Sequence, residues 1–134
     1  MADQEKLYYR YWGKAKKDED SGVAYHLLPY HCLDVVAVAE AWWKNSSALR
    51  EQLRQSAQLE NEEQMHAWLM FFICLHDLGK LDFRFQMKSS AAIEQLQPAN
   101  YALIKATFDY KASYDHGSNG YGWFKNEFIL YGFN

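Results

Sequence analysis

The feature that most constrains this 134-residue chain is an apolar stretch that ends in a histidine and an aspartate. Residues 67–75 are apolar at every position, so a helix over them has no polar face, and we expect it to be buried on all sides. His76 and Asp77 follow directly, and Gly79 is placed to stop the helix. An uncompensated polar group in a core costs about 2–7 kcal/mol. The pattern therefore indicates either a metal site or a helix end whose His and Asp bind each other and water.

Composition favours one compact domain over residues 1–134. Hydrophobic residues make up 49% of the chain and aromatic residues 17%, which excludes a disordered chain. The net charge is −3 and no run of Lys and Arg dominates, so any nucleic-acid contact would be local. No signal core or membrane-length apolar run is evident, and Cys32 and Cys74 have the surroundings of core residues in a reducing compartment. We expect a cytoplasmic protein.

Periodicity predicts an all-α fold of five or six helices. Pro29 suits the first turn of a helix that ends at Trp43, and Ser46 or Ser47 can cap a short exposed helix after it. Asn61 and Gln64 resemble a capping box. The further expected helices are the central one from about Glu62 to Leu78, a short one over 91–97 capped by Ser90, and a weak one within 99–111.

The remaining segments are predicted to be irregular. Lys14–Gly22 has the composition of an exposed loop, Phe83–Gln86 of an irregular turn and Tyr114–Gly120 of a loop with an Asn-Gly turn signal. The aromatic cluster Leu7–Trp12 is expected to pack on the helices, with a base-stacking platform as the alternative. An aromatic tail from Trp123 should dock on the body, on a partner or on a second copy of the chain.

Three separate segments supply candidate metal ligands: His31, the pair His76 and Asp77, and His116. His31 lies in a first helical turn, where the helix dipole favours a neutral imidazole, and Asp34 could orient it. A lone histidine on an apolar helix face is also compatible with a hydrogen-bonded core residue. Imidazole and carboxylate ligands suit Mn, Fe, Ni, Co or Zn better than Mg or Ca.

Such a site could support metal-assisted phosphoester hydrolysis. Lys80, one turn beyond the pair, could neutralise a phosphate as charge develops. The alternative for Lys80 is a surface lysine near a helix C-terminus, where the dipole favours a cation. We therefore predict Asp77 and Lys80 as the catalytic residues.

The motifs carry a resemblance to the N-terminal HD nuclease domain of the type I CRISPR-associated helicase–nuclease, Cascade subtype, within the HD phosphohydrolase superfamily. It covers roughly residues 8–124, and His76-Asp77-Leu-Gly-Lys80 is its centre. The other matching segments are Tyr11-Trp-Gly-Lys14, Tyr25-His-Leu-Leu-Pro-Tyr-His-Cys-Leu-Asp-Val35, the apolar stretch from Ala67, Phe83-Arg-Phe-Gln86, and His116-Gly117 with Trp123-Phe124.

The resemblance implies an HD-type helical bundle that holds two metal ions and degrades single-stranded DNA, recruited by Cascade and fed by a helicase. His31, His76 and Asp77 would bind the first metal, which in this reading is Mn, Fe, Ni or Co. Asp77 would bridge to the second metal, where His116 would be a further ligand.

The sequence departs from the family after His116. The expected His-His-Gly motif and a later aspartate do not occur, and residues 125–134 form a divergent aromatic tail. One hypothesis is therefore a truncated, non-catalytic HD domain that binds Cascade in place of the full enzyme and interferes with CRISPR immunity. The other is an active HD nuclease that uses one metal, completed by Asp115 or by dimerisation, to cleave single-stranded DNA.

Overall fold

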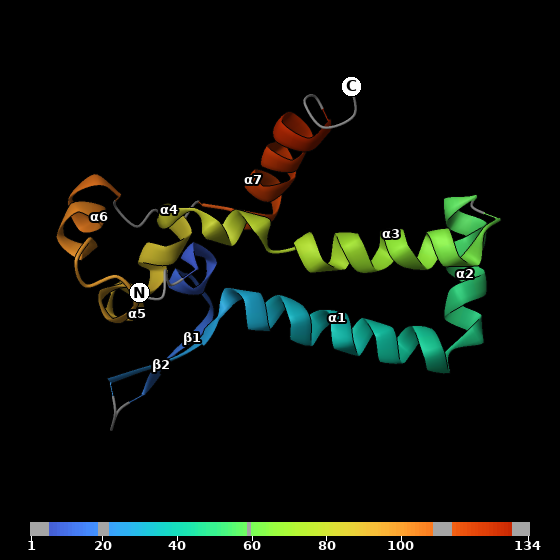
Figure 1. Cartoon of the computed structure of the whole chain (residues 1–134), viewed down its shortest axis with the longest axis horizontal. Helices are drawn as coiled ribbons and strands as arrows, with labels where there is room; N and C mark the ends of the chain where they lie inside the picture. The colour runs from blue at the N-terminus through green and yellow to red at the C-terminus, as the bar shows by residue number, and fades with distance from the viewer. Residues whose placement is uncertain (1–5, 19–21, 59, 109–113, 130–134) are drawn as a thin grey trace. The chain divides into compact units, whose positions relative to one another are not determined.

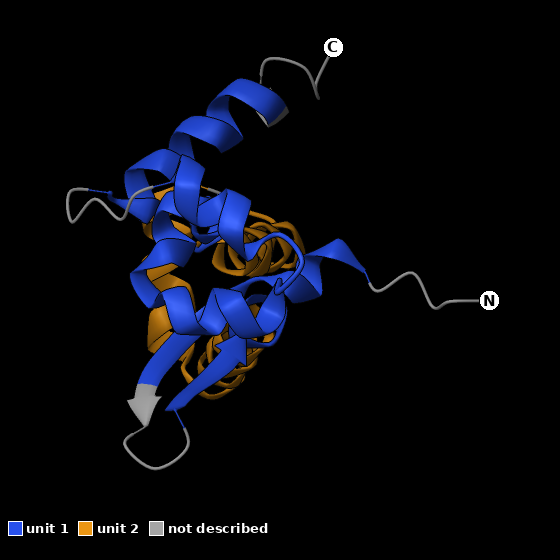
Figure 2. Cartoon of the chain, turned by 90° about the vertical axis from the view of Figure 1, so that its left-hand side faces the viewer, with its two compact units in different colours: residues 1–31, 77–134 blue, residues 32–76 orange. Residues whose placement is uncertain are grey.

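The computed structural model describes residues 6–18, 22–58, 60–108 and 114–129. It is mostly helical, as predicted, and divides into two compact units, residues 1–31 with 77–134 and residues 32–76 (Figures 1 and 2). No helix among the described residues is long and apolar enough to cross a membrane. The elements in chain order are η1 (Leu7–Arg10), β1 (Trp12–Asp18), β2 (Gly22–Leu27), α1 (Leu28–Asn45), α2 (Ser47–Ala57), α3 (Glu62–Leu75), η2 (Leu78–Leu81), α4 (Phe83–Gln86), η3 (Met87–Ser89), α5 (Ser90–Leu96), α6 (Tyr101–Thr107), α7 (His116–Trp123) and the π-helix η4 (Phe124–Ile129).

The expected loop Lys14–Gly22 is wrong, because most of it belongs to an antiparallel hairpin of β1 and β2. The strands alternate between two faces, as period-2 geometry requires. Ala15, Val23 and Tyr25 pack on the core of unit 1, while Lys14 and Lys16 are exposed. The lysines made the strand resemble a loop, and its short inward-facing Ala15 gave little apolar signal.

A buried glutamine clamps the start of this hairpin to the short helix α4. The Gln86 side chain is fully buried, and its Oε1 accepts a hydrogen bond from Trp12 N at 3.0 Å. Its Nε2 donates to Trp12 O at 2.9 Å and to Lys80 O at 2.7 Å. The Trp12 indole in turn donates to Gln86 O at 3.0 Å and lies 4.9 Å from the Phe85 ring centroid. The expected irregular turn at 83–86 is therefore a helical turn fixed by this clamp.

Unit 2 contains most of α1 together with α2 and α3, joined in series so that α2 connects two longer helices (Figure 1). Its capping predictions are confirmed: Ser46 Oγ accepts from Leu49 N, and Asn61 Oδ1 accepts from Gln64 N. The expected burial of residues 67–75 is wrong, since Met65 is the buried residue of α3 among those described. Trp68, Phe71 and Phe72 are 38–49% exposed, and Cys74 is exposed rather than a core residue.

The predicted loop at Tyr114–Gly120 is also wrong, because α7 begins at His116. Asp115 caps it, with Oδ1 accepting from Gly117 N at 3.0 Å. Gly120 lets the backbone of α7 approach η2 closely, and a Cβ placed on Gly79 would lie 1.9 Å from the carbonyl oxygen of His116. Gly120, part of the Asn-Gly turn signal, therefore serves a close packing of two backbones. The end of the aromatic tail, residues 130–134, lies outside the described residues.

Candidate metal centre

Asp77 is the centre of the candidate site. Its carboxylate is buried and lies against three cationic or imidazole groups of unit 1. Oδ2 is 2.9 Å from His31 Nε2 and 2.7 Å from Lys80 Nζ, and Oδ1 is 3.3 Å from His116 Nε2. The two oxygens therefore point to different histidines, one from the first turn of α1 and one from the first residue of α7.

His31 is buried at 7% exposure, and burial lowers the pKa of its imidazole. The charges of Lys80 and Lys14 lower this pKa further, while Asp77 opposes the shift. The neutral form is thus favoured at physiological pH, and neutral imidazole is the form that ligates metals. The first-turn position of His31 in α1 acts in the same direction.

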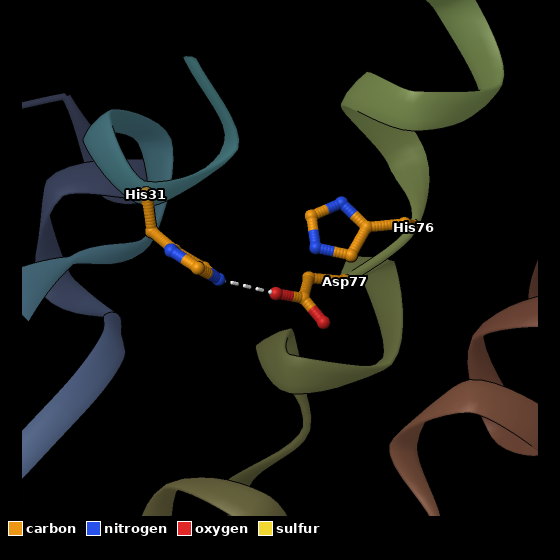
Figure 3. Close-up of side chains that lie close together, drawn as sticks. All are labelled: His31, His76 and Asp77. Carbon is orange, nitrogen blue, oxygen red and sulfur yellow. Dashed lines mark ion pairs between the residues drawn. The ribbon is translucent and has the colours of Figure 1, made fainter. Parts of the chain in front are cut away.

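His76 is the last residue of unit 2 and is bonded to Asp77, so the peptide bond keeps the two neighbours. Its Nδ1 donates a hydrogen bond to Ile73 O at 2.6 Å, which selects the tautomer with its lone pair on Nε2. Ligand atoms of His31, His76 and Asp77 lie within 4.8 Å of one another (Figure 3). This donor set fits a divalent transition metal.

His116 lies beside the same carboxylate and is partly exposed, with its ring 5.1 Å from that of Phe85. The neighbouring Asp115 does not contribute a ligand from this position, because its carboxylate caps α7 and accepts from Ser118 Oγ at 2.6 Å. The hydrogen bond from Ser118 makes the largest contribution to lowering the pKa of Asp115, and the bond from the Gly117 backbone lowers it further. Completion of the site by Asp115 is therefore disfavoured by its geometry.

Lys80 is buried at 8% exposure, so it is not the surface lysine that the sequence left as an alternative. Its ammonium binds Asp77 Oδ2 and donates to Gly13 O at 3.1 Å, and it lies 5.5 Å from the Phe85 ring centroid. It therefore joins η2 to the first residues of β1. Because the Lys80 ammonium lies between Asp77 Oδ2 and Gly13 O, it is suited to holding the Asp77 carboxylate in place.

Two residues that support the site were not foreseen as such, Gly13 and Gln86. Gly13 is buried against His31: a Cβ placed on it would lie 2.7 Å from the Cβ of His31. Both residues lie in segments that carry the family resemblance, but local sequence does not indicate these roles, because each acts through a partner distant in the chain.

We expect Gly13→Ala to destabilise unit 1 by about 1–3 kcal/mol, because the added methyl forces His31 out of place. Chemical denaturation of the purified variant measures this. Gly122→Ala is the matched control, since a Cβ there meets no atom within 4 Å, and it should leave stability unchanged or raise it by up to about 1 kcal/mol. Equal stability of the two variants would contradict the packing of Gly13 on His31.

Comparison with known proteins shows the family of the chain. The family model described as "Cas3, HD domain" matches residues 12–131. The chain is 42% identical over 117 residues to the CRISPR-associated endonuclease/helicase Cas3 of Escherichia coli strain K12. That alignment covers 87% of this chain and 13% of the relative, so the chain spans a small part of the relative's length. No solved structure matched the chain.

Proposed function

Because the chain belongs to the HD-domain family of Cas3, we propose that its Asp77 site binds a divalent transition metal and hydrolyses phosphodiester bonds of single-stranded DNA in the cytoplasm. The observation that carries this proposal is the buried carboxylate of Asp77, which directs one oxygen to His31 and the other to His116. A bound metal would supply Lewis-acid polarisation of the phosphate and an activated water.

The roles of the residues follow from their contacts. His31, His76 and Asp77 would hold the metal, and His116, whose Nε2 lies 3.3 Å from Asp77 Oδ1, would be a further ligand. His31 Nε2 lies 2.9 Å from Asp77 Oδ2, and for this nitrogen to act as a ligand the neutral ring would carry its single proton on Nδ1, with no net loss of a proton. Lys80 would hold Asp77 in position.

The test is Co²⁺ or Mn²⁺ titration of the purified chain, together with cleavage of a single-stranded oligonucleotide. His76→Ala is the most informative variant, because His76 is exposed and its loss should leave the fold intact. We expect it to weaken metal affinity at least about 10–100-fold and to abolish cleavage. His66→Ala, which changes a histidine of α3 outside the cluster, is the matched control and should bind metal normally. Failure of the wild-type chain to bind either ion would overturn the proposal.

A second function is non-catalytic binding to Cascade in place of the full enzyme, which would interfere with CRISPR immunity. One observation favours it: Lys80 Nζ lies 2.7 Å from Asp77 Oδ2, so an ammonium of the protein balances the charge of this carboxylate. Binding of the chain to purified Cascade, and a loss of recruitment of full-length Cas3, would support it. A chain that binds metal and cleaves DNA but does not bind Cascade would reject it.

A further inference from the structure

The β1–β2 hairpin presents a small cationic face that begins at the candidate metal centre. In the register of the hairpin, Lys14 lies opposite His26 and Lys16 lies opposite Ala24, so these four residues share the face that points away from the core. Lys14, Lys16 and Ala24 are exposed, and His26 is half-buried. The two lysines lie two residues apart on one strand, which places their Cα atoms about 6.6 Å apart.

The hairpin is fixed to the metal centre at its first residues. Gly13 O accepts the hydrogen bond from Lys80, and the Cα of Gly13 packs on His31. Lys14 is therefore the first residue of β1 beyond the site. Its charge contributes to the lowered pKa of His31, which is consistent with this closeness.

A pocket also lies along the hairpin, and its lining includes residues of both faces. This pocket of about 610 Å³ is lined by Trp12, Lys14, Ala15, Lys16, Ala24, Tyr25 and His26. Its lining combines two lysine side chains and a histidine with Trp12 and Tyr25, whose rings also pack on the core of unit 1. Sites that bind single-stranded nucleic acid combine cationic groups for the backbone with aromatic groups for the bases.

We propose that this hairpin face binds the sugar–phosphate backbone of the single-stranded DNA next to the position at which it is cut, with Lys14 and Lys16 contacting phosphates. This inference rests on the proposed function for its choice of ligand. It explains how a chain with a net charge of −3 can bind a polyanion, since the required charge is local and adjoins the catalytic groups. The strand would be held by the hairpin and cleaved at the HD residues.

The test is fluorescence anisotropy of a labelled single-stranded oligonucleotide with the full chain in EDTA, over a range of salt concentrations. EDTA removes metal, so binding is measured apart from cleavage. We expect Lys14→Ala with Lys16→Ala to raise Kd at least about tenfold at low salt. The slope of log affinity against log salt should fall by about 1.4, because each phosphate contact contributes roughly 0.7 for single strands.

Two double variants serve as controls. Lys105→Ala with Lys125→Ala removes the same charge from exposed positions elsewhere in unit 1 and should leave Kd and the salt slope unchanged. Lys14→Arg with Lys16→Arg keeps the charge and should keep binding. Thermal unfolding of each variant checks that the hairpin remains folded.

The outcomes separate this inference from the proposed function. Metal binding and cleavage by a chain whose DNA affinity ignores Lys14 and Lys16 would overturn the inference and leave the proposed function in place. DNA binding that depends on Lys14 and Lys16 in a chain that binds no metal would support the inference and overturn the proposed function. Equal weakening by the two alanine pairs, or no DNA binding by the wild-type chain, would also overturn the inference.

Discussion

Gln86→Leu is expected to lower the free energy of unfolding by about 3–9 kcal/mol, which is a large part of the stability of a domain. The substitution places an apolar side chain of similar size in this fully buried position and removes both polar atoms of the amide. Trp12 N, Trp12 O and Lys80 O then lose their partners inside the core. Each buried group left unsatisfied costs about 1–3 kcal/mol, so the loss is about 3–9 kcal/mol, against a total stability of roughly 5–15 kcal/mol for a domain.

Urea denaturation followed by circular dichroism measures this effect. Gln97→Leu is the matched control, because Gln97 is also buried but its side-chain amide donates one hydrogen bond among the described residues, to Arg10 O at 3.0 Å. It should cost about 1–3 kcal/mol. If the two variants have similar unfolding midpoints, the clamp between β1 and α4 does not carry the stability assigned to it.

The parts of the fold that could be predicted from the sequence are those whose determinants are local. Ser46 and Asn61 cap the helices that follow them because the bond spans only three residues. The adjacency of His76 and Asp77 is fixed by the chain itself. The predominance of helix also follows from local periodicity.

The parts that could not be predicted depend on distant partners. The hairpin and α7 carry local signals for loops, lysines in one and glycines in the other, and long-range packing overrides both. The apolar run of α3 correctly predicted a helix but not its burial, because periodicity reports which faces are apolar and not what covers them. The burial of Lys80 could not be predicted from the sequence either, because its two oxygen partners, on Asp77 and Gly13, come from separate segments.

Asp77→Asn is expected to lower stability as well as to remove metal binding. The ammonium of Lys80, at 8% exposure, would lose the carboxylate charge that balances it. Removing one partner of a buried ion pair costs about 3–5 kcal/mol, because the other charge remains buried. A loss of cleavage in an Asp77 variant alone would therefore not distinguish lost chemistry from lost structure.

A double-mutant cycle with Lys80→Met separates the two effects. Adding Lys80→Met to Asp77→Asn removes the unbalanced charge, so we expect most of the lost stability to return while Co²⁺ or Mn²⁺ binding stays absent. The Lys80→Met variant alone leaves Asp77 with two imidazoles, and a metal cation should stabilise it more than it stabilises the wild-type chain. Thermal unfolding with and without metal measures all four corners of the cycle.

The same cycle decides between the two roles of Lys80. If Lys80 holds Asp77 in place, the stabilities of the two single variants should be coupled by more than about 1 kcal/mol, and the KM of Lys80→Met for the oligonucleotide should change little. If Lys80 neutralises a substrate phosphate, its removal should reduce cleavage while the two substitutions act on stability independently. The 2.7 Å contact with Asp77 and the bond to Gly13 O favour the first result, because both oxygens belong to the protein and already bind the ammonium.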